Sequence, residues 1–177
     1  LQGGSKRSMA AAKLLISGLQ QRLLSSIDAF ARTLRQHRKT VLKQWEDSRS
    51  GKGSEQKSFA AISPRFAQPI DQDDDRAQMT EEELAAEEAG QVEALSQASF
   101  GNLDGSAHEL FQQEQKLLEQ MTHIADDHRA EADGKVRHLI DWIRANQCPK
   151  LGSEGARWTD IRVLIFTEYE DTRRYLS

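Results

Sequence analysis

The chain has 177 residues, of which 29% are charged and 37% hydrophobic, and its mean hydropathy is -0.70. Because a compact domain normally carries about 45% apolar residues, we expect part of the chain to lie outside any packed core. No run approaches the roughly 20 apolar residues that span a bilayer, which excludes a transmembrane protein, and the N-terminal residues lack the apolar centre of a secretory signal.

The net charge of -4 is unevenly distributed: residues 1–50 carry +7, residues 51–105 carry -8 and residues 106–177 carry -3. The first third is therefore suited to a polyanion, which the middle third would repel. The single cysteine, Cys148, excludes an internal disulfide and predicts a reducing, cytoplasmic location. Leu1 at the start and an apparent helix at the end predict that the chain is a piece of a longer protein.

Apolar residues recur at helical spacing from about residue 13 to residue 45 and predict one buried face. Ser26 is a good N-cap for a second helix and would break this run. The residues of the seam are Ile16, Leu19, Leu23, Ile27, Phe30, Leu34, Val41 and Trp45, with His37 between Leu34 and Val41.

A basic stripe lies on the opposite face of the same segment. It consists of Arg32, Arg35, Lys39 and Lys43, at steps of 3, 4 and 4. This spacing suits contact with successive phosphates, but it is more typical of the solvated face of a core helix.

Residues 48–105 are predicted to form a flexible, acidic insertion with one helix. Residues 48–78 show no period typical of a helix or a strand. Thr80 and Glu83 then form a capping box, which predicts an acidic helix over about 81–98. A loop is expected over residues 99–105.

The last third is predicted to hold two helices, a strand and a final helix. Ser106 and Glu109 form a capping box for a long helix that ends near residue 130, and Asp133 is the expected N-cap of the next helix. The run Val163–Phe166 is too short for a core helix and wholly apolar, which predicts a strand buried on both faces, with a helix from Glu170. The long helix has an apolar seam of Leu110, Leu117, Met121, Ile124 and His128, and the helix after it has Val136, Leu139, Ile140 and Ile143.

No catalytic or metal-ligating constellation is predicted. The sequence Gly51-Lys52-Gly53-Ser54 has the wrong order for a phosphate-binding loop. His123 and His128 are five residues apart, which turns them away from each other on a helix. Cys148 has no nearby histidine to activate it. We therefore expect no catalytic residue, no metal ligand and no cofactor within this chain.

Three segments taken together resemble the Swi/Snf-type ATPases of helicase superfamily two. Residues 162–176 (RVLIFTEYEDTRRYL) resemble the first strand and helix of the second RecA-like lobe, and residues 132–143 (ADGKVRHLIDWI) resemble the helix before that strand. Residues 20–41 (QQRLLSSIDAFARTLRQHRKTV) are similar to the helical segment after the first lobe in bacterial members, above all the helicases of the DISARM anti-phage defence systems.

The resemblance implies a mainly α chain in four parts. These are amphipathic interlobe helices over 1–47, the acidic insertion over 48–105, a long helix over 106–131, and the start of a RecA-like α/β lobe over 132–177. The parent would be an ATP-dependent DNA translocase or helicase in phage defence, using ATP and magnesium. This chain lacks the Walker A lysine and the acidic magnesium motif, so the resemblance implies that it is inactive alone.

The resemblance also implies contacts with nucleic acid. Thr167 matches the family's phosphate-contacting place at the strand end, and its rival role is to cap the following helix. Lys135 matches the family's lysine before the lobe and would contact DNA or form a salt bridge. For the basic stripe (Arg32, Arg35, Lys39 and Lys43), the resemblance makes DNA binding as well supported an interpretation as a solvated helix face.

Double-stranded DNA, the remaining helicase lobes and other defence-system subunits are the expected partners, and no membrane is expected. The alternative function is a non-enzymatic helical interaction module. In that case the seams Ile16–Trp45 and Leu110–His128 would bind partner helices.

Overall fold

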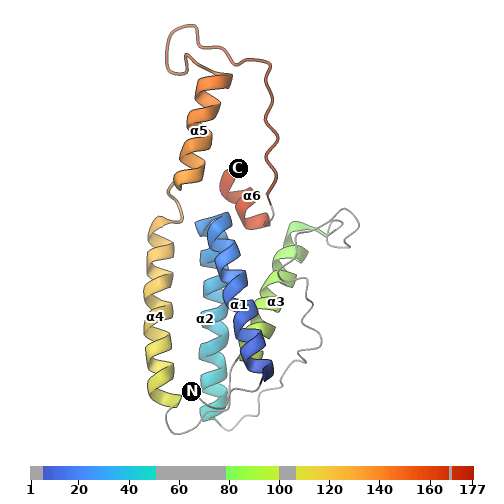
Figure 1. The fold of residues 1–177 in the computed structure, drawn as a ribbon, viewed down its shortest axis with the longest axis vertical. Coiled ribbons are helices and arrows are strands. Elements are labelled where there is room, and N and C mark those ends of the chain that lie inside the picture. Colours follow the sequence, from blue (N-terminus) through green and yellow to red (C-terminus); the bar gives the residue numbers. More distant parts are fainter. Residues whose placement is uncertain (1–5, 51–78, 100–106, 168) are drawn as a thin grey trace.

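Six helices make up the regular structure of the computed structural model, which describes residues 6–50, 79–99, 107–167 and 169–177. They are α1 (Lys6–Ser25), α2 (Ile27–Arg49), α3 (Glu81–Ser99), α4 (Ala107–His128), α5 (Gly134–Gln147) and α6 (Glu170–Leu176). Figure 1 shows α1 to α4 side by side as an elongated bundle, with α5 beyond one end and α6 at that same end. The mainly helical fold is as the sequence predicts.

The break between α1 and α2 lies at Ser26, as predicted. Its main chain is extended (φ -156°, ψ 154°), and its Oγ accepts a hydrogen bond from the Ala29 amide at 3.1 Å. Asp28 adds a negative charge in the first turn, where the helix dipole is positive. The chain reverses direction at this point, so α1 and α2 run antiparallel and pack together (Figure 1).

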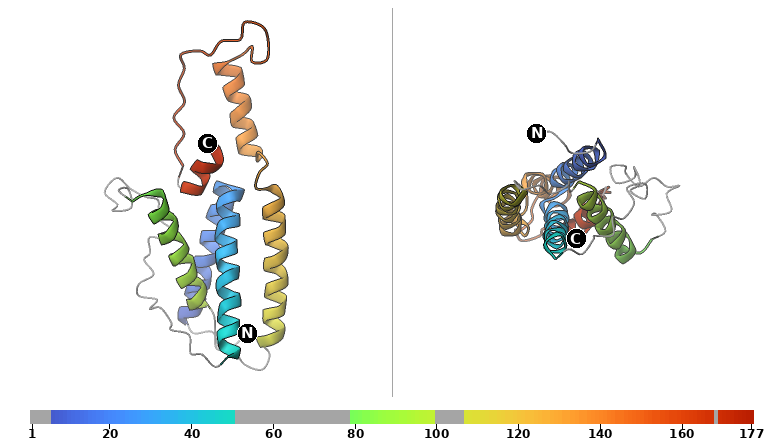
Figure 2. Two further views of the ribbon diagram at one scale, coloured as in Figure 1. Left: turned by 180° about the vertical axis from the view of Figure 1, so that it is seen from behind. Right: turned by 90° about the horizontal axis from the view of Figure 1, so that it is seen from below.

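α2 is the central helix of the bundle, because it contacts α1, α3, α4 and α6. Figure 2 shows α3 and α4 on opposite sides of it. Leu19 packs against both clusters of the hydrophobic core. One cluster joins α1 to α3 through Ala11, Leu15, Val92 and Leu95, and the other joins α2 to α4 through Phe30, Ala31, Leu34, Leu118 and Ala125.

The predicted apolar seam is correct on α2, whereas on α1 only Leu19 of its three residues packs against the core. On α2 the seam residues Phe30, Leu34, His37 and Val41 are buried. On α1, Ile16 and Leu23 are 54% and 48% exposed. Because the chain reverses at Ser26, the two helices do not share one continuous face. The residues that α1 buries are Ala11, Leu15, Gly18 and Arg22.

The capping box at the start of α3 is confirmed. The Thr80 amide donates to Glu83 Oε2 at 2.8 Å, and the Glu83 amide donates to Thr80 Oγ1 at 3.3 Å. The Glu83 carboxylate also accepts from the Thr80 hydroxyl at 2.9 Å, and the main-chain bond first and this one second hold the pKa of Glu83 below its usual value. α3 carries six glutamates, yet it packs against α1 and α2 through the buried Val92 and Leu95.

Parts of the predicted insertion lie outside the described residues. These parts are residues 51–78 and 100–106, including the Ser106 half of the second capping box. Residues 48 and 49, which were expected to begin the linker, instead form the last turn of α2.

α4 turns a different face to the bundle from the one predicted. Its buried residues are Leu118, Thr122 and Ala125, and Phe111 stacks on Trp45 of α2 with ring centroids 4.2 Å apart. The predicted seam lies on the solvent side: Leu110, Leu117, Met121 and Ile124 are 63%, 59%, 39% and 60% exposed. Both rows have helical spacing, and the sequence alone does not decide which of them meets α2.

α5 begins as predicted, because Asp133 Oδ1 accepts a hydrogen bond from the Val136 amide at 2.8 Å. It ends at Cys148, where the following Pro149 has no amide hydrogen to donate. Gly152 and Gly155 then adopt positive φ angles (89° and 81°), which glycine allows without strain.

The chain comes back along α5 after these turns. The Thr159 amide donates to the Gln147 carbonyl at 2.7 Å, and Gln147 Nε2 donates to the Ile161 carbonyl at 2.8 Å.

The predicted strand Val163–Phe166 is not formed in the structure, and its expected burial is not observed. Residues 161–167 are irregular, and Leu164 and Phe166 are 83% and 92% exposed. A strand needs a neighbour for its ladder of hydrogen bonds, and the described residues contain no other strand. The helix expected from Glu170 is present as α6.

Candidate nucleic-acid interface

The basic stripe is held on the surface of α2 by the opposite face of the same helix. Phe30, Leu34 and Val41 are fixed in the bundle, so helical geometry turns the cations away from that core. Thr33 is buried on this helix, and its hydroxyl is satisfied within the helix by donating to the Ala29 carbonyl at 3.0 Å.

The two arginines of the stripe are bound to acidic side chains. Arg32 Nη1 donates to Asp171 Oδ1 at 2.8 Å, and Arg32 Nε lies 3.8 Å from Asp28 Oδ2. Arg35 pairs with Asp126 of α4. Beside the stripe, Arg38 lies 3.6 Å from Glu119, also on α4. The arginines therefore connect α2 to its neighbours as well as carrying positive charge.

The two lysines of the stripe behave differently. Lys39 and Lys43 are exposed, and neither has an ion-pair partner in the described ranges. Their ammonium groups are free to meet an anion without breaking an existing contact. The two halves of the stripe are thus chemically unequal, which the spacing of the residues does not reveal.

A cleft of about 280 Å³ runs along the stripe, between α2 and α3. Arg32, Arg35 and Lys39 line one wall. The other wall is Ala85, Glu88, Ala89 and Val92 of α3, with Asp171 of α6 also lining the cleft. A second, open depression of about 490 Å³ continues past Arg35 and Lys39 to Lys43. All four predicted cations therefore line one continuous stretch of surface.

Lys135 and Thr167 lie together at a different cleft, of about 230 Å³, formed by α5, α6 and the end of α1. Lys135 Nζ donates to the Ser25 carbonyl at 2.6 Å and also to the Leu24 carbonyl. It thereby caps the C-terminus of α1, where the dipole favours a cation. Lys135 forms no salt bridge within the described residues, and its contact with DNA stays a prediction.

α6 lies between these two clefts, since Asp171 lines the first and Thr172 lines the second. The structure brings Lys135 and Thr167 together, and it brings the four stripe cations together. The two clefts share no lining residue.

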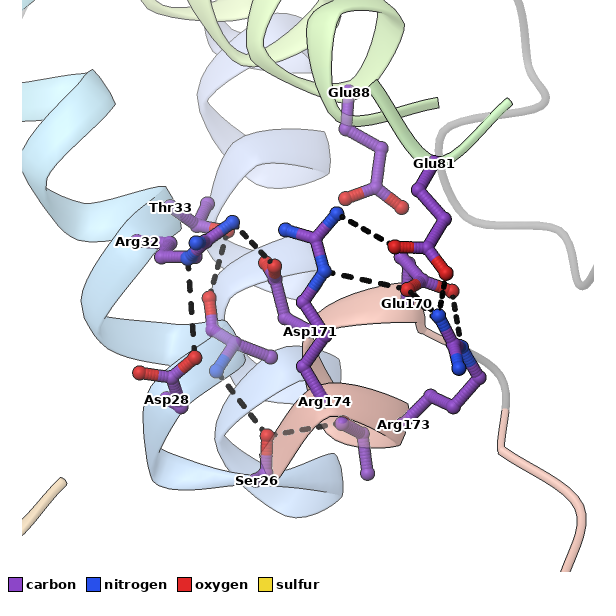
Figure 3. Close-up of polar contacts among 12 residues, drawn as sticks. Ser26, Asp28, Arg32, Thr33, Glu81, Glu88, Glu170, Asp171, Arg173 and Arg174 are labelled. Atoms are coloured by element: carbon purple, nitrogen blue, oxygen red, sulfur yellow. Dashed lines mark hydrogen bonds and ion pairs between the residues drawn. The ribbon is translucent and has the colours of Figure 1, made fainter. Parts of the chain in front are cut away.

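A network around α6, shown in Figure 3, was missed by sequence reasoning. The Thr172 hydroxyl lies 2.9 Å from Ser26 Oγ and 2.7 Å from Ser25 Oγ. Arg174 Nη2 lies 3.4 Å from Glu81 Oε2, and Arg173 pairs with the same carboxylate. These partners are about half a chain or more apart, so no local spacing could have indicated them.

Arg22 and Tyr169 extend the network inside the bundle. Arg22 is buried, its Nη2 lies 3.7 Å from Glu88 Oε2, and its guanidinium sits 4.7 Å from the centre of the Tyr169 ring. The Tyr169 hydroxyl donates to Gln21 Oε1 at 3.4 Å. Tyr169, just before α6, is therefore fixed to α1, and Arg22 joins this contact to α3.

Opposing influences act on the carboxyl of Asp171. Burial raises the pKa of Asp171 above its ordinary value, the Arg32 charge lowers it, and the nearby Asp28 charge raises it. Arg32 favours the ionised form through its charge and its hydrogen bond, and the Arg174 charge acts in the same direction.

Other features of the described residues bear on ligands and membranes. No group of three or more His, Cys, Asp or Glu side chains in the described ranges is arranged to hold a metal ion. None of the helices within those ranges is both long and apolar enough to cross a bilayer. Comparison with protein-family models, with curated proteins and with solved structures finds no match to this chain.

Proposed function

We propose that this chain is the central part of a Swi/Snf-type DNA-dependent ATPase, joining its two motor lobes and contacting the DNA backbone. In this proposal α1 to α4 form the interlobe bundle. Residues 162–176 supply the first strand and helix of the second RecA-like lobe. In the proposal, ATP and magnesium are held by other parts of the parent, because the family's Walker A lysine and acidic magnesium motif are not found in this sequence.

The observation that carries the proposal is the apolar segment before α6. Leu164 and Phe166 are 83% and 92% exposed, although both are among the most hydrophobic residue types. No hydrogen bond joins the main chain of residues 162–166 to another described residue. A segment with unpaired main chain and apolar side chains would gain hydrogen bonds and burial by joining a sheet, and in this proposal the remainder of a RecA-like lobe provides that sheet.

The basic stripe supports the DNA-binding part of the proposal. Lys39 and Lys43 are without partners in the described ranges and line the same surface as the two arginines. Contacts of this kind go to phosphates and carry no sequence preference. Thr167 and Lys135 would add contacts at the lobe itself, near the start of α6.

Amide exchange in the full-length gene product tests the strand. We expect the amides of residues 163–166 to be strongly protected there and to exchange fast in the isolated 177-residue chain, because the sheet belongs to the rest of the lobe. Fast exchange in both proteins would contradict the proposal. DNA-stimulated ATP hydrolysis by the same full-length protein tests the activity.

The stripe is tested by a double variant of the full-length protein, Lys39→Ala with Lys43→Ala. Loss of two phosphate contacts should weaken duplex binding. It should also reduce the magnitude of the slope of log affinity against log salt concentration by about 1.8. The matched control is Lys13→Ala with Lys116→Ala, which removes two exposed lysines from α1 and α4. An equal salt slope in the two double variants would reject the role of the stripe.

A second candidate function is a non-enzymatic helical interaction module. The observation that favours it is the exposed row of Leu110, Leu117, Met121 and Ile124 along α4. In that case Leu117→Glu would abolish partner binding, and duplex DNA would stimulate no ATP hydrolysis in the full-length protein.

A further inference from the structure

Asp171 and a DNA phosphate would compete for the same donor. The Arg32 guanidinium donates to Asp171 Oδ1 at 2.8 Å, and a phosphate oxygen accepts from arginine in the same way. The Arg32 side chain is 42% exposed and lines the cleft beside the stripe, so an anion can approach it from solvent. Arg32 cannot serve the carboxylate and a phosphate fully at the same time.

α6 is attached in a way that permits its release. It has only seven residues, which is too short to be stable alone. Its ion pairs with Glu81 of α3 join partly exposed side chains: Arg173 and Glu81 are 49% and 54% exposed. Pairs of this kind contribute little stability each and weaken with salt. An anion at the stripe can therefore displace Asp171 without unfolding the bundle.

We propose that α6 is an autoinhibitory element of the basic stripe, in which Asp171 occupies Arg32 in place of a DNA phosphate and duplex binding displaces it. The inference rests on the proposed DNA contact and adds its regulation. Lys39 and Lys43 make the first contacts, because they have no acidic partner in the described part of the chain. Arg32 joins them once α6 moves away.

The rival account is that Asp171 only anchors α6. Both accounts predict some loss of stability when Asp171 is changed, but only competition predicts tighter DNA binding. The test therefore measures affinity of the full-length protein for a short duplex over a series of salt concentrations. The variant is Asp171→Asn, which keeps the size of the side chain and removes its charge.

The control is Glu170→Gln, which makes the same change of net charge one residue earlier. Glu170 pairs with Arg173 and Arg174 and not with the stripe. We expect Asp171→Asn to bind duplex about threefold to fivefold more tightly than Glu170→Gln, with a salt slope steeper by about 0.9. In an Arg32→Ala background, Asp171→Asn should give no gain over Glu170→Gln.

Two results would overturn the inference: equal affinities of Asp171→Asn and Glu170→Gln, or a gain that persists when Arg32 is absent. Amide exchange on the wild-type protein gives a test that needs no variant. Added duplex should speed the exchange of residues 171–176, and slower or unchanged exchange contradicts displacement. If no variant binds duplex in a salt-dependent way, the proposed DNA contact falls as well. Loss of binding in the Lys39 and Lys43 double variant, with no difference between Asp171→Asn and Glu170→Gln, removes only the autoinhibition.

Discussion

The bundle of α1 to α4 and the arm formed by residues 134–177 differ in how far they bury their apolar side chains. In the bundle, Leu34 and Leu95 are fully buried. In the arm, α5 buries no residue at all, and Trp158 and Phe166 are 62% and 92% exposed. The bundle is held by the hydrophobic effect, whereas the arm touches it mainly through polar groups.

The polar contacts of the arm are specific but individually weak. The Tyr175 hydroxyl donates to the Glu131 carbonyl at 2.6 Å, and Thr172 meets Ser26. Hydrogen bonds of this kind contribute about 1 kcal/mol each, because water competes for the same groups. The arm can therefore move while the bundle stays folded, and its apolar surface stays available for a partner.

The largest expected effect is a loss of stability on truncating a leucine in the bundle, compared with the same change in the arm. Leu34→Ala removes a fully buried side chain between α2 and α4 and should lower the free energy of unfolding by about 2–5 kcal/mol. Leu164→Ala, in the arm, is the matched control and should stay within about 0.5 kcal/mol. Denaturant unfolding of the 177-residue chain measures both. Equal losses would mean that residue 164 is buried in solution.

Acid should weaken the bundle through His37. This side chain is buried against α3, with Nδ1 2.8 Å from Ser96 Oγ, and burial lowers the pKa of His37 to about 4 from 6.5. The folded state therefore favours the neutral ring. Its stabilising contribution is complete above pH 6.5 and is lost as the pH falls from 6.5 to about 4, by roughly 3 kcal/mol in all.

Stability measured over a pH series, with His37→Gln as the comparison, isolates this effect. Glutamine keeps a donor for Ser96 and does not titrate, so the variant should lose less stability in that window. Parallel curves for the two proteins would show that His37 does not carry the acid sensitivity.

A smaller effect lies where the bundle meets the arm. Ser26→Ala removes the N-cap of α2 and the contact with Thr172, and should cost about 1 kcal/mol. Ser17→Ala, at an exposed site within α1, should change the stability by less than about 0.5 kcal/mol. Thermal unfolding of the two variants compares them, and equal melting temperatures would remove the role given to Ser26.

The smallest effect is expected at the stripe. Lys39→Ala and Lys43→Ala remove exposed side chains with no ion-pair partner in the described ranges, so each should leave stability within about 0.5 kcal/mol of wild type. The same unfolding measurement checks this. A larger loss would mean that the lysines hold the bundle together, and any change in DNA binding could then follow from misfolding.

Local rules predicted the helix starts well. Three helices are capped at the positions that the sequence predicts, by Ser26, by the Thr80 and Glu83 capping box, and by Asp133. Such caps are predictable because each involves only residues three apart in the chain. The predicted strand failed for the opposite reason. Strand formation depends on a neighbour distant in the sequence, and none is present among the described residues.

The candidate site was predicted in part. Spacing placed Arg32, Arg35, Lys39 and Lys43 on one face of a helix, and the structure has them on one surface. That the arginines are paired and the lysines are not could not be predicted, since Asp171 lies 139 residues from Arg32 in the chain. Lys135 and Thr167 were brought to one cleft by the return of the chain at Gly152 and Gly155.

The sequence by itself determined where α2, α3, α5 and α6 begin, which residues of α2 face the core, and that a row of cations follows its other face. These depend on the repeat of 3.6 residues and on hydrogen bonds between near neighbours. Only the tertiary structure decided which row of α4 meets α2 and which cations acquire acidic partners. Both outcomes depend on the order in which helices pack in space, and a helical period contains no information about that order.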